Sequence, residues 1–359
     1  MPDHSGDSVP KRYAWEALVT FAGELLHRAG LPQDRAAMTA ELFVEADLLG
    51  YVTHGLRRLP INVEWLETGS TNATGDVTVE RRSETSQVWD ANFLPGPWVT
   101  ARAVDAASEA AQRFGIGMIS IRRSQHIACL AAQLTRAADR RMLILLCAST
   151  PSEAVVSAHG GVDRLFSCNP IAALIPTQET PILIDTSMSM SALGPLYWAH
   201  AGRNRLPVAC IVNSDGSVTD DPDAFVAGDG AILPMGGIDQ GYKGFALNLL
   251  TEALSAALAG AGRADGNEEG EANAVYVQVI DPDHFAGRSA FERQTSALAA
   301  LSRSSRVAPG APPVRVPGDR ALALRENQLR TGVGLSSRIV SELRVCAEKY
   351  GVRLPPPLN

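Results

Sequence analysis

The segment Thr53-His54-Gly55-Leu56-Arg57-Arg58 holds two side chains that could act together on one small molecule. If Gly55 opens a helical turn, residues four apart lie about 5 to 6 Å apart at Cβ, so His54 and Arg58 share a face. An imidazole transfers protons near neutral pH, and a guanidinium binds a carboxylate with two parallel hydrogen bonds. We therefore hypothesise proton transfer by His54 and carboxylate binding by Arg58. The alternative is a histidine at a helix start beside a solvated arginine.

A second histidine lies in Ser124-Gln125-His126, at the junction of a predicted strand and a predicted helix. We predict that His126 projects at the N-terminus of that helix, where anions bind and the pKa of an imidazole is lowered. The alternative is that Ser124 caps the helix and His126 is only solvated.

Two further clusters carry polar side chains at the ends of apolar segments. Asp185-Thr186-Ser187 follows a predicted strand, and Asp185 could orient an imidazole, hold a ribose hydroxyl or form a turn. The glycine-rich run 236–244 offers backbone N–H groups and Lys243 at a helix start, which suits a pyrophosphate. The alternative for this run is a glycine turn that admits a close helix.

Familiar nucleotide motifs are missing. There is no G-x-G-x-x-G, and the run 236–244 does not match the P-loop pattern, so nothing in the sequence indicates a Rossmann site.

The apolar periodicity predicts an alternation of helices and strands. We expect helices over 14–29, 34–50, from near Gly55, and over 98–114, 126–140, 245–258 and 336–350. We expect exposed strands within 77–88 and further strands over 116–121, 143–147, 171–176, 182–184, 208–212 and 275–280. The remaining predictions are a tight turn at 213–217, a polar loop at 263–271 and an extended connector at 303–316.

Composition limits the class of protein. With 359 residues, 45% of them hydrophobic, the chain can bury a large core in two or three lobes. The net charge of −7 argues against a nucleic acid partner. Five scattered cysteines without a C-x-x-C pair favour neither disulfides nor zinc, and no metal is predicted. Residues 1–11 lack a signal-peptide pattern and no segment is long enough to span a membrane, so we expect a cytoplasmic protein.

In combination, these motifs resemble the malate/L-lactate dehydrogenase family, which is unrelated to the Rossmann-fold dehydrogenases and includes ureidoglycolate, sulfolactate, diketogulonate and cyclic imino acid oxidoreductases. The matching segments are Thr53-His54-Gly55, Arg58-Leu59-Pro60, Ser124-Gln125-His126, Asn169-Pro170-Ile171-Ala172, 185–189, 233–237, Tyr242-Lys243-Gly244, 279–282 with Phe285, and Pro317-Gly318.

The resemblance implies an α/β (α+β) fold with a mixed, largely antiparallel sheet and a helical domain built from both chain ends. It divides the chain into 12–72, which begins the substrate and dimer domain, 73–230, which forms the cofactor-binding sheet domain, and 231–359, which completes the first domain. It also implies a homodimer that uses NAD or NADP.

The same resemblance implies roles for individual residues. His54 or His126 would be the proton donor, Arg58 would hold the substrate carboxylate, and Asp185 would also take part in catalysis. The cofactor would contact Ser124, Ser149, Thr150, Asn169, Asp185, Thr186, Ser187, Gly236, Gly237, Tyr242, Lys243, Gly318, Asp319 and Arg320.

Three departures from the family pattern bear on the substrate more than on the reaction. They are Asn62 in place of an aromatic residue, Ile127-Ala128-Cys129 in place of a glycine-rich helix start, and the inserted Ile238-Asp239-Gln240. The resulting hypothesis is hydride transfer between nicotinamide and a small 2-hydroxy/2-oxo acid. The alternatives are a cyclic imino acid reductase, a metal-dependent hydrolase using His54, His126 and Asp185, and a binding protein without catalysis.

Overall fold

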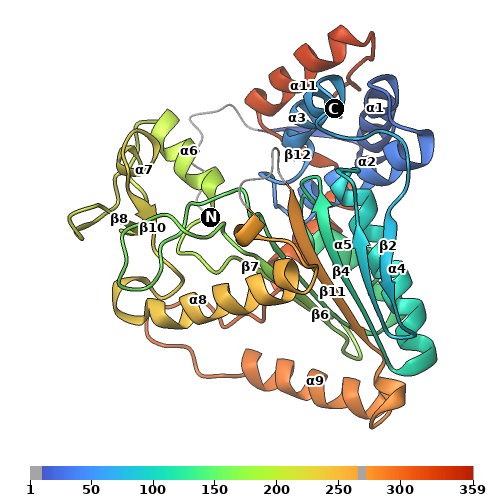
Figure 1. The fold of residues 1–359 in the computed structure, drawn as a ribbon, viewed down its shortest axis with the longest axis vertical. Coiled ribbons are helices and arrows are strands. Elements are labelled where there is room, and N and C mark those ends of the chain that lie inside the picture. Colours follow the sequence, from blue (N-terminus) through green and yellow to red (C-terminus); the bar gives the residue numbers. More distant parts are fainter. Residues whose placement is uncertain (1–9, 266–271, 359) are drawn as a thin grey trace.

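A seven-stranded sheet organises the centre of the computed structural model, which describes residues 10–265 and 272–358 (Figure 1). Its strand order is β2-β3-β4-β11-β5-β6-β7. The pairing of β3 with β4 is parallel and the other pairings are antiparallel. The predicted mixed, largely antiparallel sheet is therefore confirmed. The strands are β2 (Thr78–Arg82), β3 (Ser86–Asp90), β4 (Ile116–Ser124), β5 (Leu143–Ser149), β6 (Ile171–Ile175), β7 (Ile182–Thr186) and β11 (Asn273–Ile280).

Two helices, α4 (Gly96–Phe114) and α5 (Leu130–Arg136), pack against this sheet and close the largest hydrophobic core. The alanine-rich face of α4 allows a very close approach to β4. A Cβ atom at Gly117 would lie 2.0 Å from the carbonyl oxygen of Ala107. The absence of a side chain at Gly117, near the start of β4, therefore lets α4 lie directly against the strand.

A second core joins the two ends of the chain. It contains α1 (Trp15–Arg28), α2 (Gln33–Leu48), α3 (Leu59–Glu67) and α11 (Ser337–Lys349), which gather on one side of the sheet in Figure 1. Strand β1 (Lys11–Tyr13) pairs antiparallel with β12 (Val333–Leu335) and ties the two ends together. The helical domain built from both chain ends is confirmed, whereas the exact boundaries 12–72, 73–230 and 231–359 stay predictions.

The third part of the molecule lies beside the end of β7. It contains α6 (Leu193–Ala201), α7 (Asp223–Val226) and a small sheet of β8 (Ile211–Val212), β9 (Val218–Thr219) and β10 (Ala231–Ile232). The predicted tight turn is present here, because the N–H of Gly216 donates to the carbonyl of Asn213 over 2.9 Å. The predicted strand over 208–212 is shorter, with two residues in β8.

Several helices differ from the sequence prediction. Helix α8 begins at Gly237 and ends at Glu252, so it starts earlier than the helix expected over 245–258, and most of the glycine-lysine run lies within it. Helices α9 (Arg288–Arg303) and α10 (Asp319–Thr331) were absent from the prediction, although the irregular connector between them agrees with it. Most of the predicted polar loop, 266–271, and the polar N-terminus, 1–9, lie outside the described residues.

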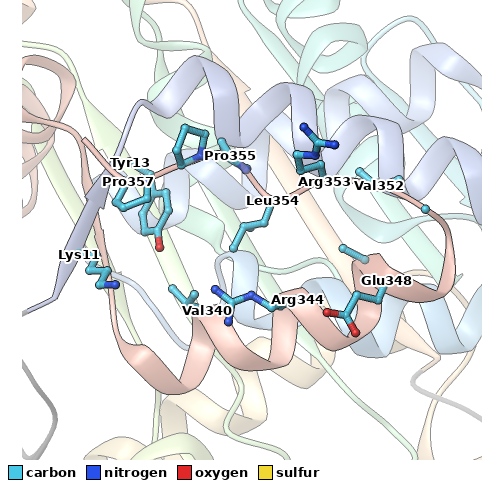
Figure 2. Close-up of a pocket in the computed structure, with 13 residues that line it drawn as sticks. Lys11, Tyr13, Val340, Arg344, Glu348, Val352, Arg353, Leu354, Pro355 and Pro357 are labelled. Atoms are coloured by element: carbon cyan, nitrogen blue, oxygen red, sulfur yellow. The ribbon is translucent and has the colours of Figure 1, made fainter. Parts of the chain in front are cut away.

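A groove of about 570 Å³ runs between α11 and the C-terminal tail (Figure 2). Its walls include Tyr13 from β1, Val340 and Arg344 from α11, and Leu354 from the tail. Within the described residues, the groove shares no side chain with the predicted site. No helix in 10–265 or 272–358 is long and apolar enough to cross a bilayer.

Candidate active site

His54 lies in a tight turn that follows α2. Its N–H donates to the carbonyl of Tyr51 over 2.9 Å, and the N–H of Arg58 donates to the carbonyl of Gly55 over 2.8 Å. The second bond closes a 3-10 helix over Leu56–Arg58, which is the helical turn that the sequence predicts at this place. His54 and Arg58 are both half-buried.

Asp47 holds this turn from α2. Its Oδ2 atom accepts the N–H of Leu56 over 2.8 Å, and a Cβ atom at Gly55 would lie 2.4 Å from the carboxyl group. Glycine is therefore required at position 55 for the carboxyl to reach the turn. Burial raises the pKa of Asp47 to about 7, and the bond from Leu56 lowers it in part. The Oδ1 atom is buried and has no hydrogen-bond partner in the part of the chain that the structure describes.

His126 is held by the start of α4. A Cβ atom at Gly96 would lie 2.1 Å from the carbonyl oxygen of Gln125 and 2.5 Å from that of His126, so these backbones touch. The N–H of Ala128 donates to Nδ1 of His126 over 3.1 Å. A nitrogen that accepts a hydrogen bond carries no proton, so the neutral ring of His126 carries its proton on Nε2.

The predicted position of His126 at a helix N-terminus is wrong, because α5 begins only at Leu130. Two features delay the helix: Ala128 has a left-handed φ of 61°, and the N–H of Ile127 donates to Oδ1 of Asn273 over 3.2 Å. Neither feature is a local property of the sequence.

The imidazole rings of His54 and His126 are stacked, with ring centroids 5.8 Å apart and an interplanar angle of 23°. Burial, followed by the charges of Arg58 and Arg57, lowers the pKa of His54 to about 4. Burial, followed by the charges of Arg58 and His54, lowers the pKa of His126 well below its ordinary value. Arg58 therefore lies within electrostatic reach of both rings, and the two rings are neutral at pH 7.

The free nitrogen of each ring follows from its other contact. The Nδ1 atom of His54 lies 2.7 Å from Oγ1 of Thr53, and the Nδ1 atom of His126 is engaged by Ala128. In both histidines Nε2 is therefore the nitrogen left for exchange of a proton with a ligand.

Asp185 lies on β7 and occupies the N-terminus of α5. Its Oδ2 atom accepts the N–H of Ala131 over 2.9 Å and lies 3.9 Å from Sγ of Cys129. Burial raises the pKa of Asp185 to about 6, and these two contacts lower it in part. Burial, followed by the negative charge of Asp185, also raises the pKa of Tyr51, which precedes the His54 turn. Asp185 therefore acts on the segment that leads into the His54 turn and on the start of α5.

The chain after Asp185 links the histidines to α8. The carbonyl of Met188 accepts the N–H of Met235 over 2.9 Å and the side-chain amide of Asn248 over 3.1 Å. Farther along, a Cβ atom at Gly194 in α6 would lie 2.7 Å from Cγ2 of Thr53. Segment 185–194 therefore contacts both α8 and the residue next to His54.

The first turns of α8 present the predicted glycine-lysine cluster. Gly236 and Gly237 have left-handed φ angles of 102° and 66°, while Tyr242 and Lys243 are exposed. A Cβ atom at Gly244 would lie 2.5 Å from the backbone nitrogen of Met235, which explains why a residue with low helix propensity lies inside this helix. The cluster is helical, yet it still presents a lysine close to a helix N-terminus.

Other predicted cofactor residues lie in a buried polar network. Oγ of Ser149 lies 2.9 Å from Oγ of Ser255, and the Nδ2 atom of Asn169 donates to Glu252 over 3.1 Å. The hydroxyl of Ser124 donates to the carbonyl of Gln125 over 2.8 Å, and Thr150 accepts the side-chain amide of Asn273 over 2.9 Å. The side chains of Ser124, Ser149 and Asn169 are fully buried.

The remaining predicted residues lie near the two ends of β7. The hydroxyl of Thr186, at its C-terminal end, is exposed, and Ser187 is half-buried. At the other end, a Cβ atom at Gly318 would lie 2.8 Å from the nitrogen of Leu183. Asp319 forms an ion pair with Arg303 over 2.6 Å, and Arg320 is exposed.

Sequence reasoning did not find three residues of this site, namely Asp47, Tyr51 and Arg57. A signal existed for Asp47, since it follows the apolar residues Ala40 and Phe43 at helical spacing and so falls on the buried face of α2. Its buried position there follows from the helical period. The described residues contain no group of three or more histidine, cysteine, aspartate or glutamate side chains able to hold a metal ion.

The fold and this histidine-arginine site together define a class of enzyme, and comparison with known proteins gives the family. Residues 13–344 match the malate/L-lactate dehydrogenase family. The chain is 30% identical to the (2R)-3-sulfolactate dehydrogenase (NADP(+)) of Chromohalobacter salexigens, over 91% of this chain and 96% of that protein.

Solved structures of related enzymes have the same fold as this chain. The malate dehydrogenase of Pyrococcus horikoshii superposes with a TM-score of 0.88 at 26% identity, covering 98% of this chain and 99% of that chain. The delta1-piperideine-2-carboxylate reductase of Pseudomonas syringae superposes with a TM-score of 0.79 at 26% identity, covering 94% and 100%.

The chain belongs to the malate/L-lactate dehydrogenase family. It is an oxidoreductase of the class that acts on hydroxy acids with NAD(P). The expected family, fold class and reaction class are confirmed, while the roles of individual residues stay predictions.

Proposed function

We propose that this enzyme interconverts a small 2-hydroxy acid and the corresponding 2-oxo acid at the site formed by His54, His126 and Arg58. The observation that carries the proposal is the convergence of two stacked imidazoles with a guanidinium that acts on both of them. This arrangement offers a proton carrier beside a carboxylate-binding group, which are the two functions that a 2-oxo acid requires.

Arg58 binds the substrate carboxylate in this proposal. Its planar fork of N–H donors matches the two oxygens of a carboxylate, and a bound anion offsets the positive charge that lowers the pKa of His54. Substrate binding therefore offsets the effect of Arg58 on the pKa of His54, whereas burial, the main cause of the lowered pKa, remains.

His54 exchanges the proton at the substrate oxygen. In the direction of oxidation, the neutral ring takes the proton of the hydroxyl group, and in the direction of reduction the ring returns it. His126 is the alternative, because its neutral ring already carries a proton on Nε2. We assign Asp185 to a supporting position, in which it fixes the start of α5 and bears on Tyr51.

The residues near α8 and β7 fit a dinucleotide. A pyrophosphate needs N–H donors and a cation, and in this proposal Gly236 at the start of α8 and Lys243 supply them beside the exposed ring of Tyr242. The N–H of Gly237 instead donates to the carbonyl of Pro234 over 2.9 Å. Thr186, Ser187 and the 318–320 segment offer further polar groups. When bound, the nicotinamide supplies or accepts the hydride.

We propose a cytoplasmic homodimer that uses one face of α8. Ile238, Leu249 and Leu250 of α8 are each at least half exposed, and so is Leu258 just beyond the helix end; together they are the apolar stripe of α8. Solvent-exposed apolar stripes of this length mark protein interfaces. The five free cysteines suit a reducing compartment.

A second candidate is reduction of a cyclic imino acid, which the likeness to the piperideine-carboxylate reductase favours. Both candidates are tested by following absorbance of NADH and NADPH with pyruvate, oxaloacetate and a cyclic imino acid. Turnover of a 2-oxo acid supports the proposal. Turnover of the imino acid alone supports the second candidate, and turnover of none overturns both.

A further inference from the structure

Arg57 is a second guanidinium beside the proposed proton carrier. It lies in the same 3-10 helix as Arg58, and its charge contributes to the lowered pKa of His54. The proposed function gives it no role, since one arginine suffices for the carboxylate next to the reacting carbon.

The guanidinium of Arg57 is half-buried and lies over the ring of Trp198. Its central carbon lies 5.0 Å from the ring centre of Trp198 on α6, within the range of a cation–π contact. Helix α6 is fixed against this segment by the close approach of Gly194 to Thr53. A guanidinium in such a contact still has N–H donors that can bind an anion.

In the described part of the chain, the Arg57 side chain makes no hydrogen bond or ion pair. The carboxylate that influences it, Glu342, is already paired with Arg338 over 2.9 Å. Burial is the main cause of a lowered pKa at Arg57. A half-buried cation of this kind gains most from an anion that arrives with the ligand.

The two arginines differ in which histidines their charges affect. Arg58 influences both His54 and His126, whereas Arg57 influences His54 but is not among the charges that act on His126. Arg58 therefore acts on both rings, whereas Arg57 acts on His54 and contacts Trp198 of α6. A substrate held by both arginines must carry anionic groups at both of its ends.

We propose that Arg57 binds a second anionic group on the substrate, so that the enzyme selects dianionic 2-oxo and 2-hydroxy acids over monoanionic ones. This inference rests on the proposed function. The group recognised is an anionic oxygen cluster on C3, which is a carboxylate in oxaloacetate and a sulfonate in 3-sulfopyruvate. Pyruvate is the matched monoanion, since it carries hydrogen at that place.

The test compares kcat/KM for oxaloacetate, 3-sulfopyruvate and pyruvate in the wild type and in Arg57→Gln. We expect the wild type to prefer at least one dianion. With that dianion, kcat/KM of the variant should fall on the order of 10- to 100-fold. With pyruvate, kcat/KM of the variant should differ from that of the wild type by less than about 3-fold. The two dianions distinguish a carboxylate from a sulfonate as the natural group.

Arg57→Lys keeps the charge without the planar fork, so its loss with the preferred dianion should be smaller than that of Arg57→Gln. Arg330→Gln, on the exposed surface of α10, is the control and should leave all three values unchanged. Equal losses for dianion and pyruvate in Arg57→Gln would show that Arg57 only anchors α6, and would overturn the inference. No loss with either substrate would overturn it too.

Failure of this inference differs from failure of the proposed function. A wild type that turns over pyruvate as efficiently as both dianions keeps the proposed function and removes the role of Arg57. A wild type that turns over no 2-oxo acid with NADH or NADPH removes the proposed function itself.

Discussion

The rings of His54 and His126 lie with their centroids 5.8 Å apart, although they come from segments far apart in the chain. One ring is placed by the turn after α2 and the other by the loop after β4, so the pair joins the helical domain to the sheet domain. A chemical site at this junction depends on how the two domains pack. Relative motion of the two domains would therefore change the distance between the two rings.

Arg58→Lys should damage recognition of the substrate carboxylate. Lysine keeps the charge and loses the two parallel hydrogen bonds, so we expect kcat/KM for 2-oxo acids to fall about 10- to 100-fold. Steady-state kinetics with pyruvate and oxaloacetate measure it, with Arg330→Lys on the surface of α10 as control. An unchanged kcat/KM for both acids would exclude Arg58 as the carboxylate-binding residue.

Asp47→Asn should change how stability depends on pH. The folded pKa of Asp47 is raised from 3.8 to about 7, so its proton stabilises the folded state at low pH, and this contribution is lost as pH rises through 7. The asparagine variant lacks this titration. The free energy of unfolding of the wild type minus that of the variant should fall by about 3 kcal/mol from pH 5 to pH 8.

Urea denaturation followed by tryptophan fluorescence at several pH values measures that difference. Glu326→Gln, an exposed carboxylate change on α10, should show no such trend. A wild-type-minus-variant difference that is constant across this pH range would contradict the buried titration of Asp47.

Lys243→Met should weaken binding of the cofactor. Loss of one charge-assisted contact to a phosphate corresponds to about a 10-fold higher Kd for NADH or NADPH. Titration of cofactor fluorescence gives the Kd, and Lys349→Met, which removes an exposed lysine paired with Glu67, serves as control. If both variants bind the cofactor as the wild type does, α8 does not hold its phosphates.

Leu250→Glu should dissociate the proposed homodimer, because it places a charge within the apolar stripe of α8. Light scattering after gel filtration should show a dimer for the wild type and a monomer for the variant. Leu301→Glu, at an equally apolar and 70% exposed position on α9, should remain dimeric. A monomeric wild type, or two variants that behave alike, would rule out this interface.

Local signals predicted some elements well. Helix α1 was expected over 14–29 and is found at Trp15–Arg28, because a clear helical period ends at Gly30-Leu31-Pro32. The turn with His54 and Arg58 followed from the same kind of spacing. These features depend on residues that are neighbours in sequence.

Tertiary contacts explain what the sequence did not reveal. The late start of α5 depends on Asn273 and Asp185, and the helical form of Tyr242-Lys243-Gly244 depends on close packing of Gly244 against Met235. The place of Asp47 in the site depends on its bond to Leu56, which lies nine residues further along the chain. No local pattern encodes such long-range partners.

His54→Gln is the most direct test of the central claim that His54 exchanges the proton beside Arg58. Rates of NADH or NADPH oxidation with the preferred 2-oxo acid should show kcat lowered by about 10²- to 10⁴-fold, with cofactor Kd within about 2-fold of the wild type. The kcat of His126→Gln, measured in parallel, should fall less than that of His54→Gln. An unchanged kcat in His54→Gln together with a large loss in His126→Gln would contradict the assignment and move the proton to His126.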